Sequence, residues 1–381
     1  MFLTTEEQED FRQAVRQMCE DKVAPHAAEC DEQAKYPWHA HEAFTAMGLM
    51  GLTFPEDCGG SGADHVTWAI CIEEIARVDA ASSLIPAICD LAMTPVMRYG
   101  SKEVQQRFMT PICEGRAQAS YCLSEAEAGS DVASMTTRAE RDGDEWVING
   151  RKQWITNAGI SDFYVVFAKT DRSAGHRGIS CFVVEKDRPG FSVGKLEHKL
   201  GIRASPTGEV ILEDVRVPHE NMVGEEGKGF YYAMGTFDWS RPVIGAQAVG
   251  IAQGALDYAA NYMQERRTFG QPLTNYQGLQ FMVADMAMQI EAARGLVYRA
   301  AAMADSNHPD LTRMASMAKC FAGDVAMKVT TDAVQLLGGY GFTKDFPVER
   351  MFRDAKITQI YEGTNQIQRM VIARKTFTGV R

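Results

Sequence analysis

The sequence predicts an α+β protein of three domains, in which a helical domain is followed by a β domain and then by a bundle of helices. Two changes in the spacing of apolar residues carry this prediction: a helical period of about 3.6 gives way to a period of about 2, and the helical period then returns. The length of 381 residues agrees, because one core usually stops growing at about 250–300 residues. The predicted domains are residues 1–117, 118–225 and 226–381.

The first domain is expected to begin with a helix, since Thr5 and Gln8 form a capping-box pattern followed by apolar residues at helical spacing. Further helices are expected after Pro37 and over 65–78, 84–99 and 102–113. The segment PEDCGGSGAD (55–64) is expected to be a loop because of its Pro, Gly and Asp content. Its glycines lack the G-x-G-x-x-G spacing and follow no strand, so a dinucleotide-binding loop is not predicted.

The middle domain is predicted from short runs rich in Val, Ile and aromatic residues and separated by Gly, Asp and Pro. These runs are EWVING, FYVVFAKT, GISCFVVEKD, FSVGKLE and GEVILEDVRVP. After it, helices rich in Ala, Met and Leu are expected, as in a closely packed bundle. Their ranges are 229–266, 276–306, 311–337 and 347–376.

Composition argues against several classes of function. The net charge is −11 and there is no run of Lys or Arg, which argues against binding of nucleic acid or of an anionic membrane surface. No signal-peptide pattern is present and no apolar run approaches the roughly 20 residues that span a bilayer, so a cytoplasmic protein is expected. The nine cysteines are scattered without a C-x-x-C pair, which predicts reduced thiols and no metal site.

The segment RDAKITQIYEGTNQIQR (353–369) carries the chemistry from which the rest of the functional prediction starts. Glu362 is followed by Gly363 and Thr364, and a glycine here is expected to interrupt a helix and leave backbone N–H groups unpaired. A carboxylate beside free N–H donors suits removal of a proton next to a carbonyl, because the base takes the proton and the donors stabilise the oxyanion. The alternative is a solvated surface glutamate at a helix break.

Three other segments suggest a flat, anionic ligand. YCLSEAEAGSD (121–131) leaves a strand and enters a loop of small and hydroxyl residues, where backbone N–H groups can approach a ligand. RKQWITNAG (151–159) places Trp154 and Thr156 on one face of a strand, and ERRTFGQPL (265–273) has two arginines and an aromatic ring at a helix end. The alternatives are an ordinary turn, a core tryptophan and a solvated helix end.

Together these segments resemble the acyl-CoA dehydrogenase family, and above all its short- and medium-chain branch. The resemblance covers essentially the whole chain and rests on CLSEAEAGSD, WITN, FDWSRP, ERRTFG, QLLGGYG and YEGTNQIQR, which occur in the family's order and at similar separations. It implies a helical N-terminal domain, a middle β-barrel-like domain with an orthogonal sheet, and a C-terminal four-helix bundle. It also implies FAD, bound between domains and across a subunit interface, and a homotetramer.

The reaction that this resemblance implies is α,β-dehydrogenation of an acyl-CoA thioester to the 2-enoyl-CoA. Glu362 is expected to remove the α-proton while a hydride passes from the β-carbon to flavin N5, and the Glu362 N–H and a ribityl hydroxyl are expected to stabilise the enolate. The expected electron acceptor is an electron-transfer flavoprotein, with Trp154 near the exposed edge of the ring. The alternatives are an enoyl-CoA reductase, an acyl-CoA oxidase, which is typically a longer chain, and a catalytically silent flavin-binding scaffold.

The resemblance also implies particular contacts. Flavin contacts are expected from the middle domain, at Tyr121, Leu123, Ser124, Gly129, Ser130, Trp154, Ile155 and Thr156. Contacts to the FAD of a neighbouring subunit are expected from Arg266, Phe269, Gln277, Gln335, Gly338 and Gly339, and contacts to the pyrophosphate from Thr364 and Gln366. Contacts to the substrate are expected from Ser130, Asp238, Arg241 and Gly363.

Two positions refine the match to the family. In isovaleryl-type branches the base comes from the FDWSRP segment, at the position held here by Ser240, and a serine cannot take that role unaided. The base is therefore expected to be Glu362. The family's usual proline after Glu125 is Ala126 here, which is expected to loosen that loop without removing the flavin contacts.

Asp90 lies in the otherwise apolar run LIPAICDLAM, in the helical region that borders the acyl pocket in the family. Burial of a carboxylate is costly unless it is paired or protonated. One interpretation is that Asp90 faces solvent or pairs with an arginine. The other is that it faces the substrate and indicates an alicyclic acyl group of the cyclohexanecarboxyl type, or a polar one, since relatives acting on alicyclic thioesters can use an aspartate from this region.

Overall fold

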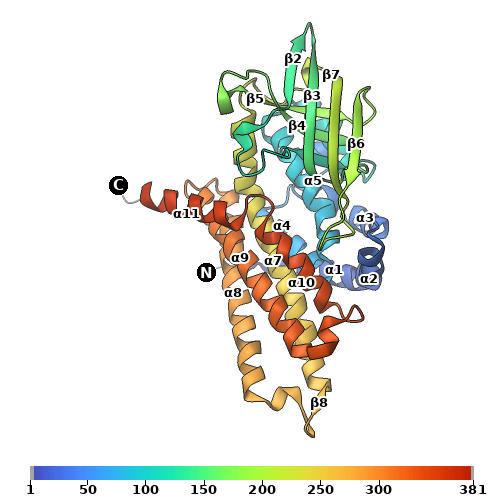
Figure 1. Ribbon diagram of the computed structural model, residues 1–381, viewed down its shortest axis with the longest axis vertical. Helices are drawn as coiled ribbons and strands as arrows, with labels where there is room; N and C mark the ends of the chain where they lie inside the picture. The colour runs from blue at the N-terminus through green and yellow to red at the C-terminus, as the bar shows by residue number, and fades with distance from the viewer. Residues whose placement is uncertain (1–3, 379–381) are drawn as a thin grey trace.

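The structure is a computed structural model that describes residues 4–378, and its helices and strands form the three regions that the sequence predicted (Figure 1). The N-terminal helices are α1 (Glu6–Lys22), α2 (Ala24–Gln33), α3 (Trp38–Ala46), α4 (His65–Val78), α5 (Ala80–Tyr99) and α6 (Lys102–Cys113). Thr5 and Gln8 form the predicted capping box. The start of α2 was not predicted, and Pro25 lies in its first turn, where its fixed φ and missing N–H suit a new helix.

The middle region is one seven-stranded sheet, shown at the top of Figure 1. Its strands are β1 (Ala119–Cys122), β2 (Arg138–Asp142), β3 (Glu145–Thr156), β4 (Phe163–Lys169), β5 (Ile179–Glu185), β6 (Phe191–Leu196) and β7 (Thr207–Pro218). The order is β1-β4-β2-β3-β7-β6, with β5 paired to β4. β2 was not predicted, because its sequence RAERD has no apolar run and only one buried residue.

The C-terminal region contains three long helices and two short ones. They are α7 (Gly229–Glu265), α8 (Gln277–Asp305), α9 (Leu311–Leu337), α10 (Val348–Ala355) and α11 (Asn365–Thr378), with the hairpin β8 (Arg267–Thr268) and β9 (Gln271–Pro272) after α7. The prediction of one helix over 347–376 was wrong. After a short 3-10 turn at Lys356–Gln359 the chain passes through Glu362 and Gly363, which both have positive φ, and an α-helix cannot continue through such residues.

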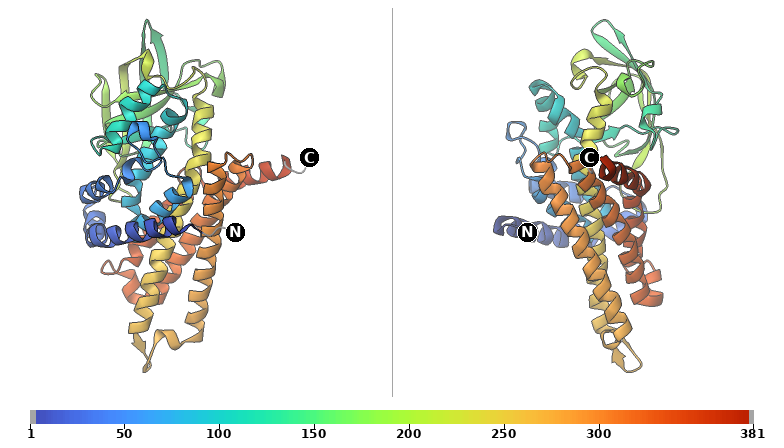
Figure 2. Two further views of the ribbon diagram at one scale, coloured as in Figure 1. Left: turned by 180° about the vertical axis from the view of Figure 1, so that it is seen from behind. Right: turned by 90° about the vertical axis from the view of Figure 1, so that its left-hand side faces the viewer.

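Two helices connect the three regions. α7 runs from the level of the sheet to the far end of the bundle (Figure 2), packing on α4, α8, α9 and α10 along its length. α5 lies under the sheet and contacts β1 and α7. One hydrophobic core therefore includes residues of the N-terminal helices, of β1 and β4, and of the C-terminal bundle, whereas a second core lies within the sheet.

α5 corrects the expectation that no apolar run approaches the length of a membrane span. Its 20 residues are long enough and apolar enough to cross a bilayer by length and composition alone. However, 89% of its most apolar window is buried inside the protein, which is typical of a core helix. The prediction of reduced thiols is confirmed, since all nine cysteines are unpaired and eight of them are buried.

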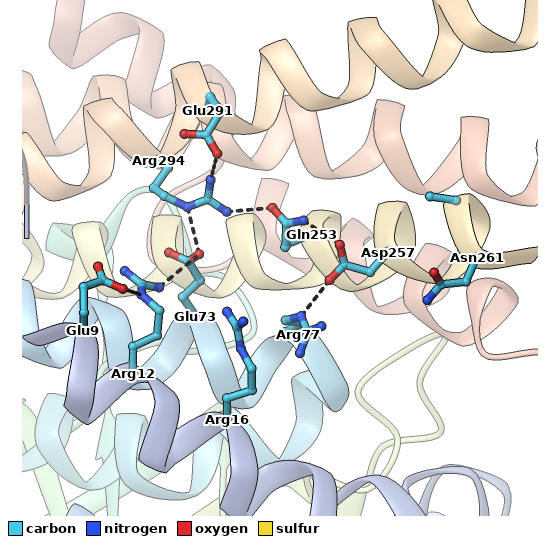
Figure 3. Close-up of a pocket in the computed structure, with 11 residues that line it drawn as sticks. Glu9, Arg12, Arg16, Glu73, Arg77, Gln253, Asp257, Asn261, Glu291 and Arg294 are labelled. Atoms are coloured by element: carbon cyan, nitrogen blue, oxygen red, sulfur yellow. Dashed lines mark hydrogen bonds and ion pairs between the residues drawn. The ribbon is translucent and has the colours of Figure 1, made fainter. Parts of the chain in front are cut away.

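An ionic network joins α1 to α4, α7 and α8 around a polar pocket (Figure 3). Arg294 of α8 donates to Glu73 of α4 at 2.9 Å and to Gln253 of α7 at 2.8 Å. Arg12 of α1 lies 3.0 Å from the buried Glu74. Each arginine of this pocket has a carboxylate partner, so the network holds the N-terminal helices against the bundle and leaves no arginine free for an anion.

A substitution in α7 tests how closely α7 and α4 approach. A Cβ at Gly254 would lie 2.0 Å from the carbonyl oxygen of Arg77, so we expect Gly254→Ala to force the helices apart and to destabilise the protein by about 1–3 kcal/mol. Gly295→Ala in α8 is the matched control, because no atom lies within 4 Å of its Cβ and alanine favours a helix by up to about 1 kcal/mol. Thermal unfolding should show a lower Tm for the first variant only.

Candidate active site

Glu362 and Gly363 form a left-handed turn between α10 and α11. Their φ angles are 53° and 90°, and a positive φ costs a non-glycine residue roughly 1–2 kcal/mol. A Cβ at position 363 would lie 2.6 Å from Nε2 of Gln368, so a larger residue would displace the amide that bonds to the turn, in addition to the cost of the positive φ. The predicted helix break at this glycine is confirmed.

Hydrogen bonds from two side chains hold the turn. Gln368 donates through Nε2 to the carbonyl oxygens of Glu362 and Gly363, at 3.1 and 3.0 Å. The buried Lys319 of α9 donates through Nζ to the carbonyl oxygen of Gly363 at 2.8 Å. These bonds offset the strain of the left-handed conformation, and they fix both carbonyl groups of the turn.

The carboxylate of Glu362 accepts a hydrogen bond from the hydroxyl of Ser240, with 2.5 Å between Oγ and Oε2. Burial raises the pKa of Glu362 to about 7, and the negative charge of Asp90 acts in the same direction. The Ser240 hydrogen bond and the positive charges of Arg241 and Lys319 oppose this increase. The result is a carboxyl group that changes its ionisation near neutral pH.

The backbone N–H of Glu362 has no hydrogen-bond acceptor within residues 4–378. Glu362 therefore has a base on its side chain and an unused donor on its backbone. A ligand carbonyl that accepts from this N–H would carry its α-carbon close to the same residue. No three His, Cys, Asp or Glu side chains in the described part of the chain are grouped so that they could hold a metal ion.

Asp90 of α5 forms no ion pair with any described residue, so the prediction that it pairs with an arginine was wrong. It is partly buried and accepts a hydrogen bond from the hydroxyl of Thr53. Burial raises the pKa of Asp90, and its charge acts on Glu362. A second carboxyl group therefore lies near the first, whereas a contact between Asp90 and a substrate stays a prediction.

Asp238 and Arg241, one turn apart on α7, form an ion pair of 3.1 Å. Asp238 also accepts a hydrogen bond of 2.7 Å from Thr312. Arg241 is buried, its Nε has no hydrogen-bond partner in the described structure, and its charge lowers the pKa of Glu362. The structure brings this pair close to the Glu362 turn, as a site for a substrate beside Glu362 requires.

The two middle-domain segments with predicted flavin contacts lie side by side. Gln153 N–H donates to the carbonyl of Ser124 at 2.9 Å, and the Ser120 hydroxyl donates to the carbonyl of Thr156 at 2.7 Å. A β-bulge lies between Lys152 and Ile155, where Trp154 has a φ of 65° and is 59% exposed. The bulge turns the indole of Trp154 away from the sheet's core.

A buried ion pair anchors the loop that follows β1. Lys152 is fully buried and donates to Glu125 at 2.9 Å and to the Leu123 carbonyl at 3.1 Å. Glu125 also accepts from the Thr136 and Thr137 N–H groups, and the Lys152 charge contributes to a Glu125 pKa of about 2. These bonds fix Glu125 beside Ala126, while the expectation that Ala126 loosens the loop stays a prediction.

The remaining predicted cofactor contacts fall into two groups. The first group lies at the far end of the bundle. There Arg266 lies over the ring of Tyr340, with 5.4 Å to the ring centroid, and Tyr340 follows Gly338 and Gly339 in the chain. Phe269, in the β8–β9 hairpin, is 98% exposed. This end lies opposite the sheet in Figure 1, so this group and the middle-domain contacts lie at opposite ends of the molecule. Thr364 and Gln366 lie next to the Glu362 turn.

The middle-domain group fits a flat ligand with polar edges. Within residues 4–378 the hydroxyls of Ser124 and Thr156 use no protein acceptor, and both residues are half-buried. The buried hydroxyl of Tyr121 also has no partner there. Unpartnered polar groups beside the exposed indole of Trp154 suit a heteroaromatic cofactor, because such groups are costly unless a ligand satisfies them.

Three residues that shape this site were not predicted from the sequence: Lys319, Gln368 and Lys152. The sequence does contain a sign of the role of Lys319, because it is the single lysine in MASMAKCFAG (314–323), a stretch whose other residues are small or apolar. A charged residue on the buried face of a helix requires a partner. The sequence does not identify that partner, since Gly363 lies 44 positions further on and contributes its backbone.

Comparison with known proteins agrees with the geometry over the full chain. Three family models match in order: Acyl-CoA dehydrogenase, N-terminal domain at residues 5–116, middle domain at 120–215 and C-terminal domain at 227–377. The chain is 54% identical to the probable acyl-CoA dehydrogenase FadE25 of Mycobacterium tuberculosis over 374 residues, which cover 98% of this chain and 96% of the relative.

Two further similarities bear on the substrate. The chain is 49% identical to a cyclohexane-1-carbonyl-CoA dehydrogenase of Geobacter metallireducens, and the alignment covers 98% of each chain. The structure of butyryl-CoA dehydrogenase from Megasphaera elsdenii superposes with a TM-score of 0.96 at 42% identity. That comparison covers 99% of this chain and 100% of the other.

The raised pKa of Glu362 predicts a pH-dependent cost to stability. A carboxyl group with a higher pKa in the folded than in the unfolded protein contributes stability below its unfolded pKa, and this contribution is lost as the pH rises to about 7. We therefore expect Glu362→Gln to raise the Tm of the ligand-free protein at pH 8, on the order of 1–3 °C. Near pH 4 the wild type and Glu362→Gln should have the same Tm. If the two proteins also have the same Tm at pH 8, the burial of this carboxylate is contradicted.

Proposed function

The chain belongs to the acyl-CoA dehydrogenase family of FAD-dependent oxidoreductases, and from that premise we propose that it oxidises an acyl-CoA thioester to the 2-enoyl-CoA, with Glu362 as the base that removes the α-proton. One observation carries the proposal: Glu362 combines a carboxyl group whose pKa is about 7 with an unused N–H on the same residue. A base with a pKa near the working pH is both ionised and a useful proton acceptor.

The chain's residues have separate roles in this reaction. The N–H of Glu362 donates to the thioester carbonyl and stabilises the negative charge that develops on its oxygen. The carboxylate of Glu362 takes the α-proton, and Ser240 orients it through the 2.5 Å hydrogen bond. Arg241 and Lys319 favour the ionised carboxylate that can accept the proton.

FAD, when bound, supplies the acceptor for the hydride from the β-carbon. We propose that it is held by the loop after β1 and the bulge of β3, where the Ser124 and Thr156 hydroxyls are free to bond a ring edge and Trp154 lies beside them. The Lys152–Glu125 pair keeps this loop in place. We also propose that Arg266 and Phe269, at the far end of the bundle, contact the FAD of a second copy of the chain. Such a contact would require a homo-oligomer, and we propose a homotetramer.

The electron acceptor is proposed to be an electron-transfer flavoprotein. Trp154 supports this, because its indole is 59% exposed and lies beside the segments assigned to the flavin. An exposed aromatic residue at that position offers a contact for a second protein near the flavin edge. Stoichiometric hydrogen peroxide during turnover would indicate an oxidase instead.

A second candidate is a dehydrogenase for an alicyclic acyl group. The observation that favours it is the position of Asp90, whose charge acts on Glu362 and which forms no ion pair with a described residue. Similarity to a cyclohexane-1-carbonyl-CoA dehydrogenase adds support. A cyclohexyl ring is as apolar as a straight alkyl chain, so Asp90 supports this candidate as a second carboxyl group near Glu362 and not as a better fit for the ring.

Replacement of the base tests the main proposal. We expect Glu362→Gln to keep bound FAD, measured by its absorbance, and to lose turnover by about a hundredfold or more, since a general base supplies at least that factor. In the wild-type protein, kcat/KM should fall below pH 7 with an apparent pKa of about 7. Glu114→Gln, at an exposed surface position, is the control. A Glu362→Gln protein with a tenth of wild-type activity would contradict the proposal.

Replacement of Asp90 tests the acyl group. We expect Asp90→Ala to lower kcat/KM for cyclohexanecarboxyl-CoA about tenfold relative to butyryl-CoA, because this candidate assigns the second carboxyl group near Glu362 a role in the oxidation of the ring only. The measurement is kcat/KM for both thioesters in the wild type, in Asp90→Ala and in the exposed control Asp10→Asn. An unchanged ranking of the two substrates would remove the alicyclic candidate.

A further inference from the structure

Lys319 is a buried charge without a carboxylate partner. It lies in the middle of α9 with no exposed surface, and within residues 4–378 it forms no ion pair. Its Nζ donates to the carbonyl oxygen of Gly363 at 2.8 Å and to Oδ1 of Asn365 at 3.0 Å. A buried ammonium group is costly unless its surroundings compensate it, and here one of these two bonds goes to the Glu362 turn and the other to Asn365 at the start of α11.

Lys152 provides an internal comparison. It is buried to the same extent, but it pairs with Glu125, as buried lysines usually require. Lys319 instead contacts a neutral carbonyl and a neutral amide, and the charge that acts most strongly in its favour is that of Glu362. Burial lowers the pKa of Lys319 to about 8, and the negative charge of Glu362 opposes this decrease.

Asn365 also links the segment after the Glu362 turn to α9. Asn365 is buried at the start of α11 and donates to the Cys320 carbonyl at 3.0 Å and to Asp324 at 2.9 Å. Lys319, Cys320 and Asp324 all lie on α9. Helix α9 therefore holds the chain on the C-terminal side of Gly363, while Lys319 holds the carbonyl of Gly363 itself.

We propose that Lys319 is a positioning residue for the base: its ammonium group holds the Gly363 carbonyl so that the left-handed turn aims the Glu362 carboxylate and N–H at the substrate, and its charge favours the ionised carboxylate. The inference rests on the proposed function for the role of Glu362. The geometry supports it, because a turn with φ angles of 53° and 90° at successive residues needs bonds that outweigh its strain.

Other charged groups also face Glu362 and must be kept constant in any test. Arg241 approaches from α7 and Asp90 from α5, while the buried phenols of Tyr121 and Tyr361 lie close enough to be affected by its charge. Lys319 is the only one of these groups that also bonds to the backbone of the turn. Its replacement is therefore expected to change both the geometry of the base and its pKa.

The test compares Lys319→Met with Lys328→Met in the FAD-loaded protein. Methionine fills similar space without charge or donor, and Lys328 is an exposed lysine on the same helix, paired with Asp332. We expect Lys319→Met to lower kcat about 10- to 100-fold with little change in KM, because a misplaced base reduces rate more than binding. Loss of the positive charge should also raise the apparent pKa of the acid limb of kcat/KM by about one unit.

The values of kcat and the acid limb of kcat/KM together decide the proposal. The expected fall in kcat together with the shifted acid limb, absent in Lys328→Met, supports it. Unchanged kcat overturns it, and so does a fall in kcat with an unmoved acid limb, since any local damage would give that result. If Lys319→Met does not fold, Lys319→Gln, which loses the charge but keeps a donor, is judged by the acid limb of kcat/KM: a raised apparent pKa supports the proposal and an unmoved one overturns it.

A second measurement does not depend on substrate. Hydrogen exchange over residues 361–368 should be at least about tenfold faster in Lys319→Met than in the wild type or Lys328→Met, because the turn loses its bond to α9. If the wild type oxidises no acyl-CoA, the proposed function fails, and this exchange result alone then decides whether Lys319 holds the turn. Unchanged exchange would overturn the inference.

Discussion

The left-handed turn at Glu362 and Gly363 is the constraint on which the site depends. A glutamate at a φ of 53° is strained, and Gln368 and Lys319 hold it there through the carbonyls of the turn. Both carbonyls are engaged, whereas the N–H of Glu362 has no acceptor within residues 4–378 and its carboxylate accepts from Ser240 through Oε2. Two features that lower the stability of the fold, a strained backbone and a buried lysine, therefore occur together at the turn that orients the proposed base.

The same arrangement explains the ionisation of the base. A carboxyl group in this enclosed position would become too weak an acid to be ionised at neutral pH if burial acted alone. A hydroxyl and two cations oppose burial, and the pKa settles at about 7. The nearby Asp90 of α5 acts in the other direction, so the ionisation of Glu362 depends on that of a second carboxyl group from a distant part of the chain.

The fold supplies these groups from distant parts of the chain. α5, α7 and α9 contribute Asp90, Ser240 with Arg241, and Lys319, while the segment between α10 and α11 contributes the base. α7 and α5 reach all three regions and form one continuous core with them, so the relative position of these side chains is fixed by packing. The sheet places the loop after β1 and the bulge of β3 side by side, and the Lys152–Glu125 pair holds that loop.

The sequence by itself determined the three regions, most helix boundaries and the break at Gly363, because these depend on local spacing, on glycine and on a family pattern that covers the whole chain. It also singled out Glu362, whose role as the base is a proposal. The tertiary structure decided which groups surround that base. Lys319 lies 43 positions before Glu362, and its contact is with a backbone carbonyl, which leaves no pattern in the side chains. The pairing of the charged strand β2 with β3 and the bond of Lys152 to Glu125, 27 positions away, likewise depend on partners that the apolar pattern of the sequence does not identify.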